Sequence, residues 1–111
     1  MWQKSTELCL KIYTLTARFP KEELYGLTSQ IRRAAVSVPS NIAEGRSRGT
    51  RKDFVQFLRV AMGSIAELET QCFISKELTY LSEPSYREIA LLLDEISRML
   101  IAMIKKLAAI S

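Results

Sequence analysis

The residues best suited to chemistry form a short cationic stretch between two expected helices. The segment SVPSNIAEGRSRGTRKDF (37–54) contains four closely spaced cations, Arg46, Arg48, Arg51 and Lys52. Guanidinium groups can donate paired hydrogen bonds to phosphate oxygens, and an ammonium group adds a point charge. The stretch also precedes an expected helix, whose free N–H groups and positive dipole end favour anions. We therefore predict contact with a phosphate backbone. The alternative is a solvated corner that keeps the protein soluble.

The charge of the chain is concentrated in the same stretch. The 111 residues carry a net charge of +4. Residues 45–59 hold five cations and one anion, whereas residues 1–44 have a net charge of +2 and residues 60–111 a net charge of −2. This asymmetry favours an acidic partner such as nucleic acid. Four further cations are predicted to widen the basic surface, although each is also an ordinary surface residue: Arg32, Arg33, Lys105 and Lys106.

The residue types that most enzymes use are missing or scattered. The chain has no histidine, which removes the commonest general base and zinc ligand. Cys9 and Cys72 are too few for a thiolate zinc site, and their apolar helical positions predict buried free thiols in a reducing compartment. Neither Glu67 with Glu69 nor Asp94 with Glu95 shares a helix face, so neither is a ready catalytic pair. We therefore expect no enzyme activity, no cofactor and no metal site.

Four amphipathic helices are predicted to position the cationic stretch. Apolar residues recur at steps of three and four over about 3–18, 24–44, 50–79 and 84–109, and strand signals are scarce. Short connections between such helices predict an all-α, antiparallel up-and-down four-helix bundle, with one domain over 1–111. The sequence shows neither a signal peptide nor a membrane span, so we expect a cytoplasmic protein with no membrane partner.

The second helix contains a proline within its apolar phase. Pro39 removes the hydrogen bond to the Ala35 carbonyl, which predicts one Pro-kinked helix instead of two helices. Ser37 and Ser40 are expected to satisfy part of the freed carbonyls. Gly45 is predicted to end the helix.

Two further local patterns concern the third and fourth helices. Thr50 and Asp53 resemble a capping box, and Ser82 or Ser85 is expected to cap the fourth helix. The small residues at 63–64 predict a close approach by another helix.

The fourth helix carries more apolar side chains than one core-facing stripe uses. Such a surplus predicts self-association, because a large exposed apolar surface is unfavourable in water. The alternative is a monomer in which the helix has a wide internal face. The surplus residues are Leu91, Leu92, Met99, Ile101, Ile104 and Ile110.

Four segments together resemble one known family over nearly the whole chain. They are WQKSTELCLKIYTLT (2–16), YGLTSQIRRAAVSVPSNIAEGRSR (25–48), FLRVAMGSIAELETQ (57–71) and EISRMLIAMIKKL (95–107). The chain resembles the bacterial four-helix bundle family whose founding members are encoded by intervening sequences within 23S ribosomal RNA genes. It is also similar to the accessory variability determinant of diversity-generating retroelements.

The resemblance implies a kinked four-helix bundle that assembles as a ring-shaped homopentamer with a basic surface. It also implies nucleic-acid binding and, for the retroelement branch, association with a reverse transcriptase. The family offers no established catalytic residues. Its SQIRRA motif corresponds to residues 29–34, with mixed assembly and surface roles, and its AEG turn to residues 43–45, with a structural role.

The leading functional hypothesis is a non-catalytic, homo-oligomeric bundle that binds RNA or DNA. Aromatic residues do not alternate with basic ones in the sequence, so binding is expected to be mostly electrostatic and weakly sequence-specific. The alternative is a protein-interaction module whose basic surface docks an acidic protein partner.

Overall fold

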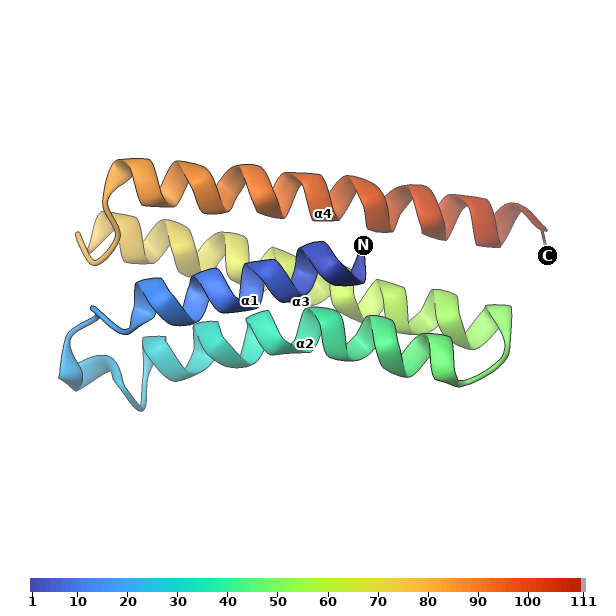
Figure 1. The fold of residues 1–111 in the computed structure, drawn as a ribbon, viewed down its shortest axis with the longest axis horizontal. Helices are drawn as coiled ribbons and strands as arrows, with labels where there is room; N and C mark the ends of the chain where they lie inside the picture. Colours follow the sequence, from blue (N-terminus) through green and yellow to red (C-terminus); the bar gives the residue numbers. More distant parts are fainter. Residues whose placement is uncertain (111) are drawn as a thin grey trace.

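Four α-helices make up the fold, and residues 1–110 form no strand (Figure 1). The computed structural model describes these residues. The observed helices lie within three residues of the predicted boundaries, so the predicted all-α fold of four helices is confirmed. They are α1 (Trp2–Thr16), α2 (Leu27–Ser47), α3 (Arg51–Glu77) and α4 (Glu83–Ile110), with a 3₁₀ turn, η1 (Lys21–Glu23), between α1 and α2.

The helices lie side by side along one long axis, but α1 is much shorter than the others. The bundle measures 47 × 24 × 19 Å, and α1 has 15 residues against 28 in α4. Figure 1 shows the N-terminus part of the way along the bundle, above α3. Since α1 packs against α2 and α4, the end of the bundle that holds the α2–α3 connection consists of three helices.

The core is built from the apolar stripes that the sequence predicts. Leu8 and Ile12 of α1 meet buried residues from the other three helices, which include Ile31, Val38, Ile42, Leu58, Ile65, Leu68, Ile89, Leu93, Ile96 and Leu100. Burial of such side chains supplies most of the free energy that holds a small bundle together.

The surplus apolar surface of α4 is smaller than predicted. Leu92 is buried, and Ile104 packs partly against the core, so neither belongs to the exposed surplus. The other four residues are exposed, with 37% to 70% of their surface accessible: Leu91, Met99, Ile101 and Ile110.

Pro39 lies inside α2 without ending it. The carbonyl of Ala35 therefore lacks its usual helical partner, and the Cys9 thiol of α1 donates to this oxygen with an Sγ···O distance of 2.9 Å. We expected Ser37 and Ser40 to serve such carbonyls, but Ser37 Oγ instead accepts from the Asn41 amide at 2.9 Å. The bend of α2 at Pro39 stays a prediction.

Gly45 does not end α2, and that prediction is wrong. The helix continues to Ser47, and the chain turns at Gly49, whose φ is +85°. Gly45 is buried instead, and a Cβ added there would lie 2.7 Å from the Cβ of Phe57. The absence of a side chain thus allows α3 to approach α2 closely.

The predicted helix caps are confirmed. The Asp53 N–H donates to Thr50 Oγ1 at 3.1 Å, and the Ser85 N–H donates to Ser82 Oγ at 3.2 Å. The close helix approach predicted at residues 63–64 holds for Ser64 but not for Gly63. Ser64 Oγ donates to Ser37 Oγ at 2.8 Å across the α2–α3 contact, whereas a Cβ at Gly63 would meet nothing within 4 Å.

Candidate nucleic-acid interface

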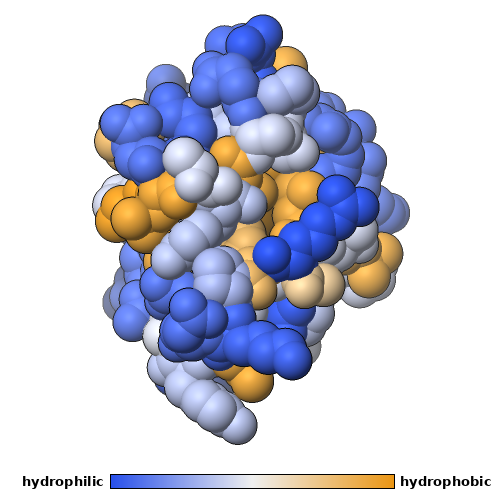
Figure 2. All heavy atoms as spheres, turned by 90° about the vertical axis from the view of Figure 1, so that its left-hand side faces the viewer, coloured by the Kyte–Doolittle hydropathy of each residue, from blue (hydrophilic) through white to orange (hydrophobic). Residues whose placement is uncertain are grey.

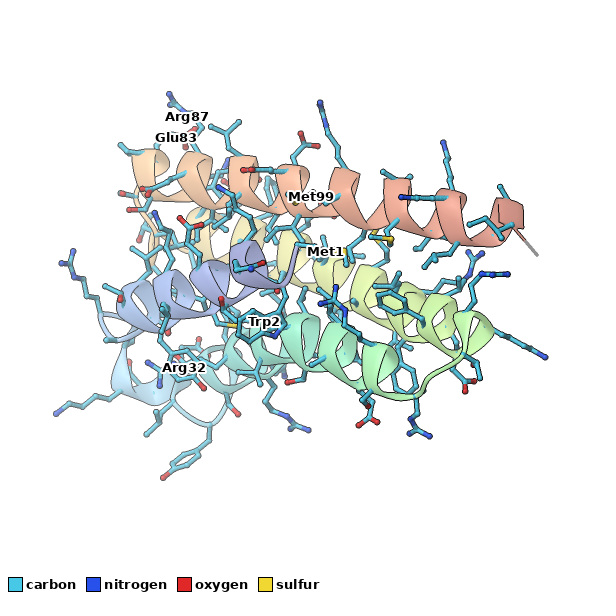
Figure 3. All side chains as sticks on the ribbon, turned by 45° about the vertical axis from the view of Figure 1, so that its right-hand side comes forward. Met1, Trp2, Arg32, Glu83, Arg87 and Met99 are labelled. Carbon is cyan, nitrogen blue, oxygen red and sulfur yellow. The ribbon has the colours of Figure 1, made fainter. Side chains whose placement is uncertain are left out.

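The four clustered cations lie where α2 passes into α3. Arg46 occupies the last turn of α2, Arg48 is its C-cap, and Arg51 and Lys52 open α3. All four side chains are exposed. We call these four residues the cationic junction. In Figure 3, nitrogen-tipped side chains fan outward at this end of the bundle.

One acidic residue reduces the charge of the cationic junction. Arg48 Nε lies 3.0 Å from Glu44 Oε2, one helical turn earlier. Within residues 1–110, Arg46, Arg51 and Lys52 form no ion pair. When Glu44 is included, residues 44–59 hold five cations and two anions. The net charge of residues 44–59 is therefore +3, whereas that of residues 45–59 is +4.

Two phenylalanines of α3 lie beneath the arginines of the cationic junction. The Arg46 guanidinium carbon lies 5.8 Å from the centre of the Phe54 ring, and that of Arg48 lies 5.1 Å from the centre of the Phe57 ring. Such cation–π contacts restrict the guanidinium groups while leaving their N–H donors available. The same two residues lie against Gly45, so the close helix contact also places the cations.

The start of α3 adds a backbone contribution to the cationic junction. Thr50 caps the helix through its hydroxyl, and the first turn of any helix retains N–H groups without helical partners. The positive end of the helix dipole lies at the same place. Asp53 stands in this turn and offsets part of the positive potential.

The end of α4 lies beside the cationic junction. Arg51, Lys52 and Leu107 line one hollow of about 410 Å³ between α3 and α4. Lys105 lines the next hollow, of about 550 Å³, together with Arg59. The structure therefore places Lys105 near Arg59, more than two turns into α3, and the adjacent Lys106 is exposed. The wider basic surface stays a prediction.

Arg32 and Arg33 lie elsewhere on α2. Arg32 is 14 residues before Arg46, which corresponds to about 21 Å along a helix. Its Nε donates to Thr16 Oγ1 at 2.8 Å, and its guanidinium carbon lies 4.5 Å from the centre of the Tyr13 ring. These contacts fasten α2 to the end of α1. The structure therefore does not join Arg32 to the cationic junction.

Arg33 is exposed and borders a separate, polar hollow of about 380 Å³ between α2 and α3. Ser37, Ser64 and Glu67 also line this hollow, together with Gln30, Ala34 and Gln71. The Gln71 Oε1 atom is buried and has no hydrogen-bond partner within the described residues. Cation and carboxylate occur here together, so this hollow lacks the uniform positive charge of the cationic junction.

The opposite end of the molecule has a different character. Figure 2 shows this end, where polar side chains surround small apolar areas. The exposed apolar side chains on the connections here include Leu24, Tyr25 and Leu78. In η1, Glu22 and Glu23 stand beside Lys21, so this turn does not form a second cationic cluster.

The two cysteines are free thiols, and Cys72 is buried as predicted, whereas Cys9 is only half-buried. Burial raises the pKa of Cys9 to about 11 and that of Cys72 to about 12. Both groups therefore remain protonated near neutral pH and are poor nucleophiles. The described part of the chain contains no group of three or more Cys, His, Asp or Glu side chains placed to hold a metal ion.

No helix among residues 1–110 combines the length and hydrophobicity needed to span a lipid bilayer.

The aromatic residues near the cationic junction are the feature that sequence reasoning missed. Phe54 and Phe57 belong to α3 and Trp2 to α1, and no local pattern relates Trp2 to the basic stretch. The chain has to fold before these side chains and the arginines share one surface.

Comparisons with known proteins agree with this fold. A family model described as 23S rRNA-intervening sequence protein matches residues 1–102. A crystal structure from Bacteroides thetaiotaomicron, described as a protein with unknown function from the S23 ribosomal protein family, is similar with a TM-score of 0.86. It is 28% identical in sequence, and the match covers 94% of each chain. No curated protein matches. Since the family model extends over most of its length, the chain belongs to the 23S rRNA-intervening sequence protein family.

Proposed function

We propose that this protein is a non-catalytic, homo-oligomeric bundle that binds RNA or DNA through its cationic junction. The observation that carries the proposal is the set of four exposed cations at the α2–α3 connection, three of which have no ion-pair partner within residues 1–110. Concentrating like charges at a helix N-terminus is unfavourable unless an anion neutralises them. A phosphate backbone supplies repeated anions at short spacing.

Self-association would strengthen such binding. The exposed side chains of Leu91, Met99, Ile101 and Ile110 on α4 offer an apolar surface for a second copy. Each added copy repeats the cationic junction, and several weak phosphate contacts on one assembly raise the overall affinity without new contacts. A homopentameric ring and association with a reverse transcriptase are proposals that rest on the resemblance alone.

The nucleic-acid proposal is tested by removing the four charges together. We expect Arg46→Gln, Arg48→Gln, Arg51→Gln and Lys52→Gln in one variant to weaken binding of a fluorescein-labelled RNA or DNA oligonucleotide at least about tenfold, because counterion release is lost. Fluorescence anisotropy at about 50 and 200 mM salt measures both the affinity and its salt dependence, which should become shallower. Circular dichroism verifies that the helices persist.

A control variant changes the net charge by the same amount at other places on the surface. Glutamine replaces four exposed cations that lie outside the cationic junction, Arg18, Lys21, Arg87 and Arg98. This variant should bind almost as well as the natural chain. If both variants lose affinity equally, overall charge and not the cationic junction governs binding, and the site assignment is wrong.

Self-association is tested by light scattering. The chain has a mass of 12.6 kDa, and we expect a multiple of this value for the natural protein. Leu91→Ser together with Ile101→Ser should shift the mass toward that of one chain, because both side chains are exposed in the isolated subunit. A single-chain mass for the natural protein contradicts the assembly proposal.

A second candidate function is docking of an acidic protein. The hollows between α3 and α4 combine apolar floors, from Val55, Met62 and Ile104, with cationic borders, and within residues 1–110 no carboxylate lines either of them. An acidic amphipathic helix has the complementary pattern. A partner that stays bound after nuclease treatment, and is released by Ile104→Ser, would favour this function over direct nucleic-acid binding.

A further inference from the structure

Trp2 lies beside the cationic junction although it is distant from it in sequence. It is the only tryptophan of the chain, and 45% of its surface is exposed. Figure 3 shows it at the start of α1, between that helix and α2. A hollow of about 360 Å³ is lined by Trp2 together with Ile42, Ala43, Arg46 and Ser47 of α2.

The short α1 is the reason that this hollow is open. Helix α1 begins at Trp2, so the last turns of α2, which continue to Ser47, have no further turn of α1 beside them. The hollow thus has an indole on one side, an apolar floor at the buried Ile42 and a guanidinium at Arg46. Among residues 1–110, no carboxylate lines it. Its volume is at the lower end of the range of about 300–1,000 Å³ found for small-ligand pockets.

We propose that this hollow binds an unpaired base of single-stranded RNA or DNA, with the base stacked on the Trp2 indole. This inference rests on the proposed nucleic-acid function and adds the form of nucleic acid that is recognised. Flat aromatic bases stack on exposed tryptophan with little regard to sequence. In a duplex the bases are already stacked and paired, so a single strand offers one to this hollow without the cost of unpairing it.

The position of Arg46 links the hollow to the phosphate contacts. Arg46 belongs both to the hollow and to the cationic junction, and its contact with Phe54 restrains the guanidinium group. Arg48, Arg51 and Lys52 follow within six residues. A strand that inserts one base beside Trp2 therefore carries its neighbouring phosphates onto these cations. The hollow confers the preference for single strands, and the cationic junction supplies most of the salt-dependent affinity.

The unique tryptophan permits a direct test. Stacking of a base on an indole quenches its fluorescence, and all tryptophan emission of this protein comes from Trp2. We expect a short oligothymidylate to quench this emission. An abasic oligonucleotide with the same number of phosphates should leave the emission nearly unchanged and bind about tenfold more weakly, as expected for the loss of one stacked base. A DNA duplex of equal length should also leave the emission nearly unchanged.

Variants separate the base contact from the phosphate contacts. Trp2→Ala should reduce oligothymidylate affinity about tenfold while affinity for the abasic strand stays the same. Trp2→Phe should retain part of the difference, because phenylalanine also offers an aromatic face. The matched control is Tyr25→Ala, which removes an aromatic side chain that is 93% exposed at the other end of the bundle and should change neither affinity.

The outcomes distinguish the two proposals. If oligothymidylate and the abasic strand bind equally, with unchanged emission, the base-stacking site is refuted and the proposed function stands. If no strand binds even at about 50 mM salt, the nucleic-acid function fails and the base site fails with it. Should Trp2→Ala prevent folding, the emission of the natural protein and the affinities of Trp2→Phe still decide the question.

Discussion

The contact between Cys9 and Ala35 shows how one residue can compensate for another at a distance. Pro39 leaves the Ala35 carbonyl without its helical N–H partner, and the thiol of Cys9 on α1 donates to that oxygen at 2.9 Å. The raised pKa of Cys9, about 11, keeps the donating proton in place at neutral pH. A free cysteine and a proline inside a helix therefore belong to the same local arrangement.

This arrangement predicts an energetic coupling between Cys9 and Pro39. Cys9→Ala should lower the free energy of unfolding by about 1–3 kcal/mol, because a buried carbonyl loses its donor. In a Pro39→Ala background residue 39 regains its N–H, so the same substitution should cost about 1 kcal/mol less. Urea denaturation of the four proteins measures this coupling. Equal costs in both backgrounds would show that the thiol contributes only its packing.

At the scale of helices, the glycines of α2 and α3 have opposite environments. Gly45 faces the α2–α3 contact, and Gly63 faces open space in the isolated subunit. Helical periodicity places both on a helix but does not reveal what lies across from them. The sequence therefore suggested a helix stop at Gly45 and a close helix approach at residues 63–64. In the structure Gly45 lies at a close helix approach, whereas Gly63 lies within α3 and faces no other helix.

Substituting alanine at each glycine should change stability in opposite directions. Gly45→Ala should destabilise the fold by about 1–3 kcal/mol, because the new Cβ would lie 2.7 Å from the Cβ of Phe57 and the helices would have to separate. Gly63→Ala should stabilise α3 by about 0.5–1 kcal/mol through its higher helix propensity. Thermal or urea unfolding gives both values. Stabilisation by Gly45→Ala would mean that the contact is less tight than described.

How far sequence reasoning succeeds depends on the range of the interaction. Helix positions and the Thr50 and Ser82 caps depend on neighbouring residues, and the structure confirms them. The pairing of Arg32 with Thr16 and the hollow between Trp2 and Arg46 depend on which helices pack together. Such contacts have no periodic signature, so they became visible only in the folded chain.

For the molecule as a whole, charge and shape divide it into two unlike ends. One end holds the cationic junction, the last turns of α4 and the hollow beside Trp2. The other end holds the α1–α2 and α3–α4 connections, where Glu22 and Glu23 stand beside Lys21 in η1. An elongated bundle with this polarity would meet a polyanion with one end first, because the long-range field orients the encounter.

The short α1 has a further consequence for local stability. Beyond Leu100, no residue of α4 up to Ile110 is fully buried, since no fourth helix covers that length. Segments with few buried contacts open at a small fraction of the global unfolding free energy. The final turns of α4 should therefore exchange their amide hydrogens much faster than its first half. Any partner that binds at this end would slow that exchange, so ligand binding would be thermodynamically coupled to ordering of the last turns of α4.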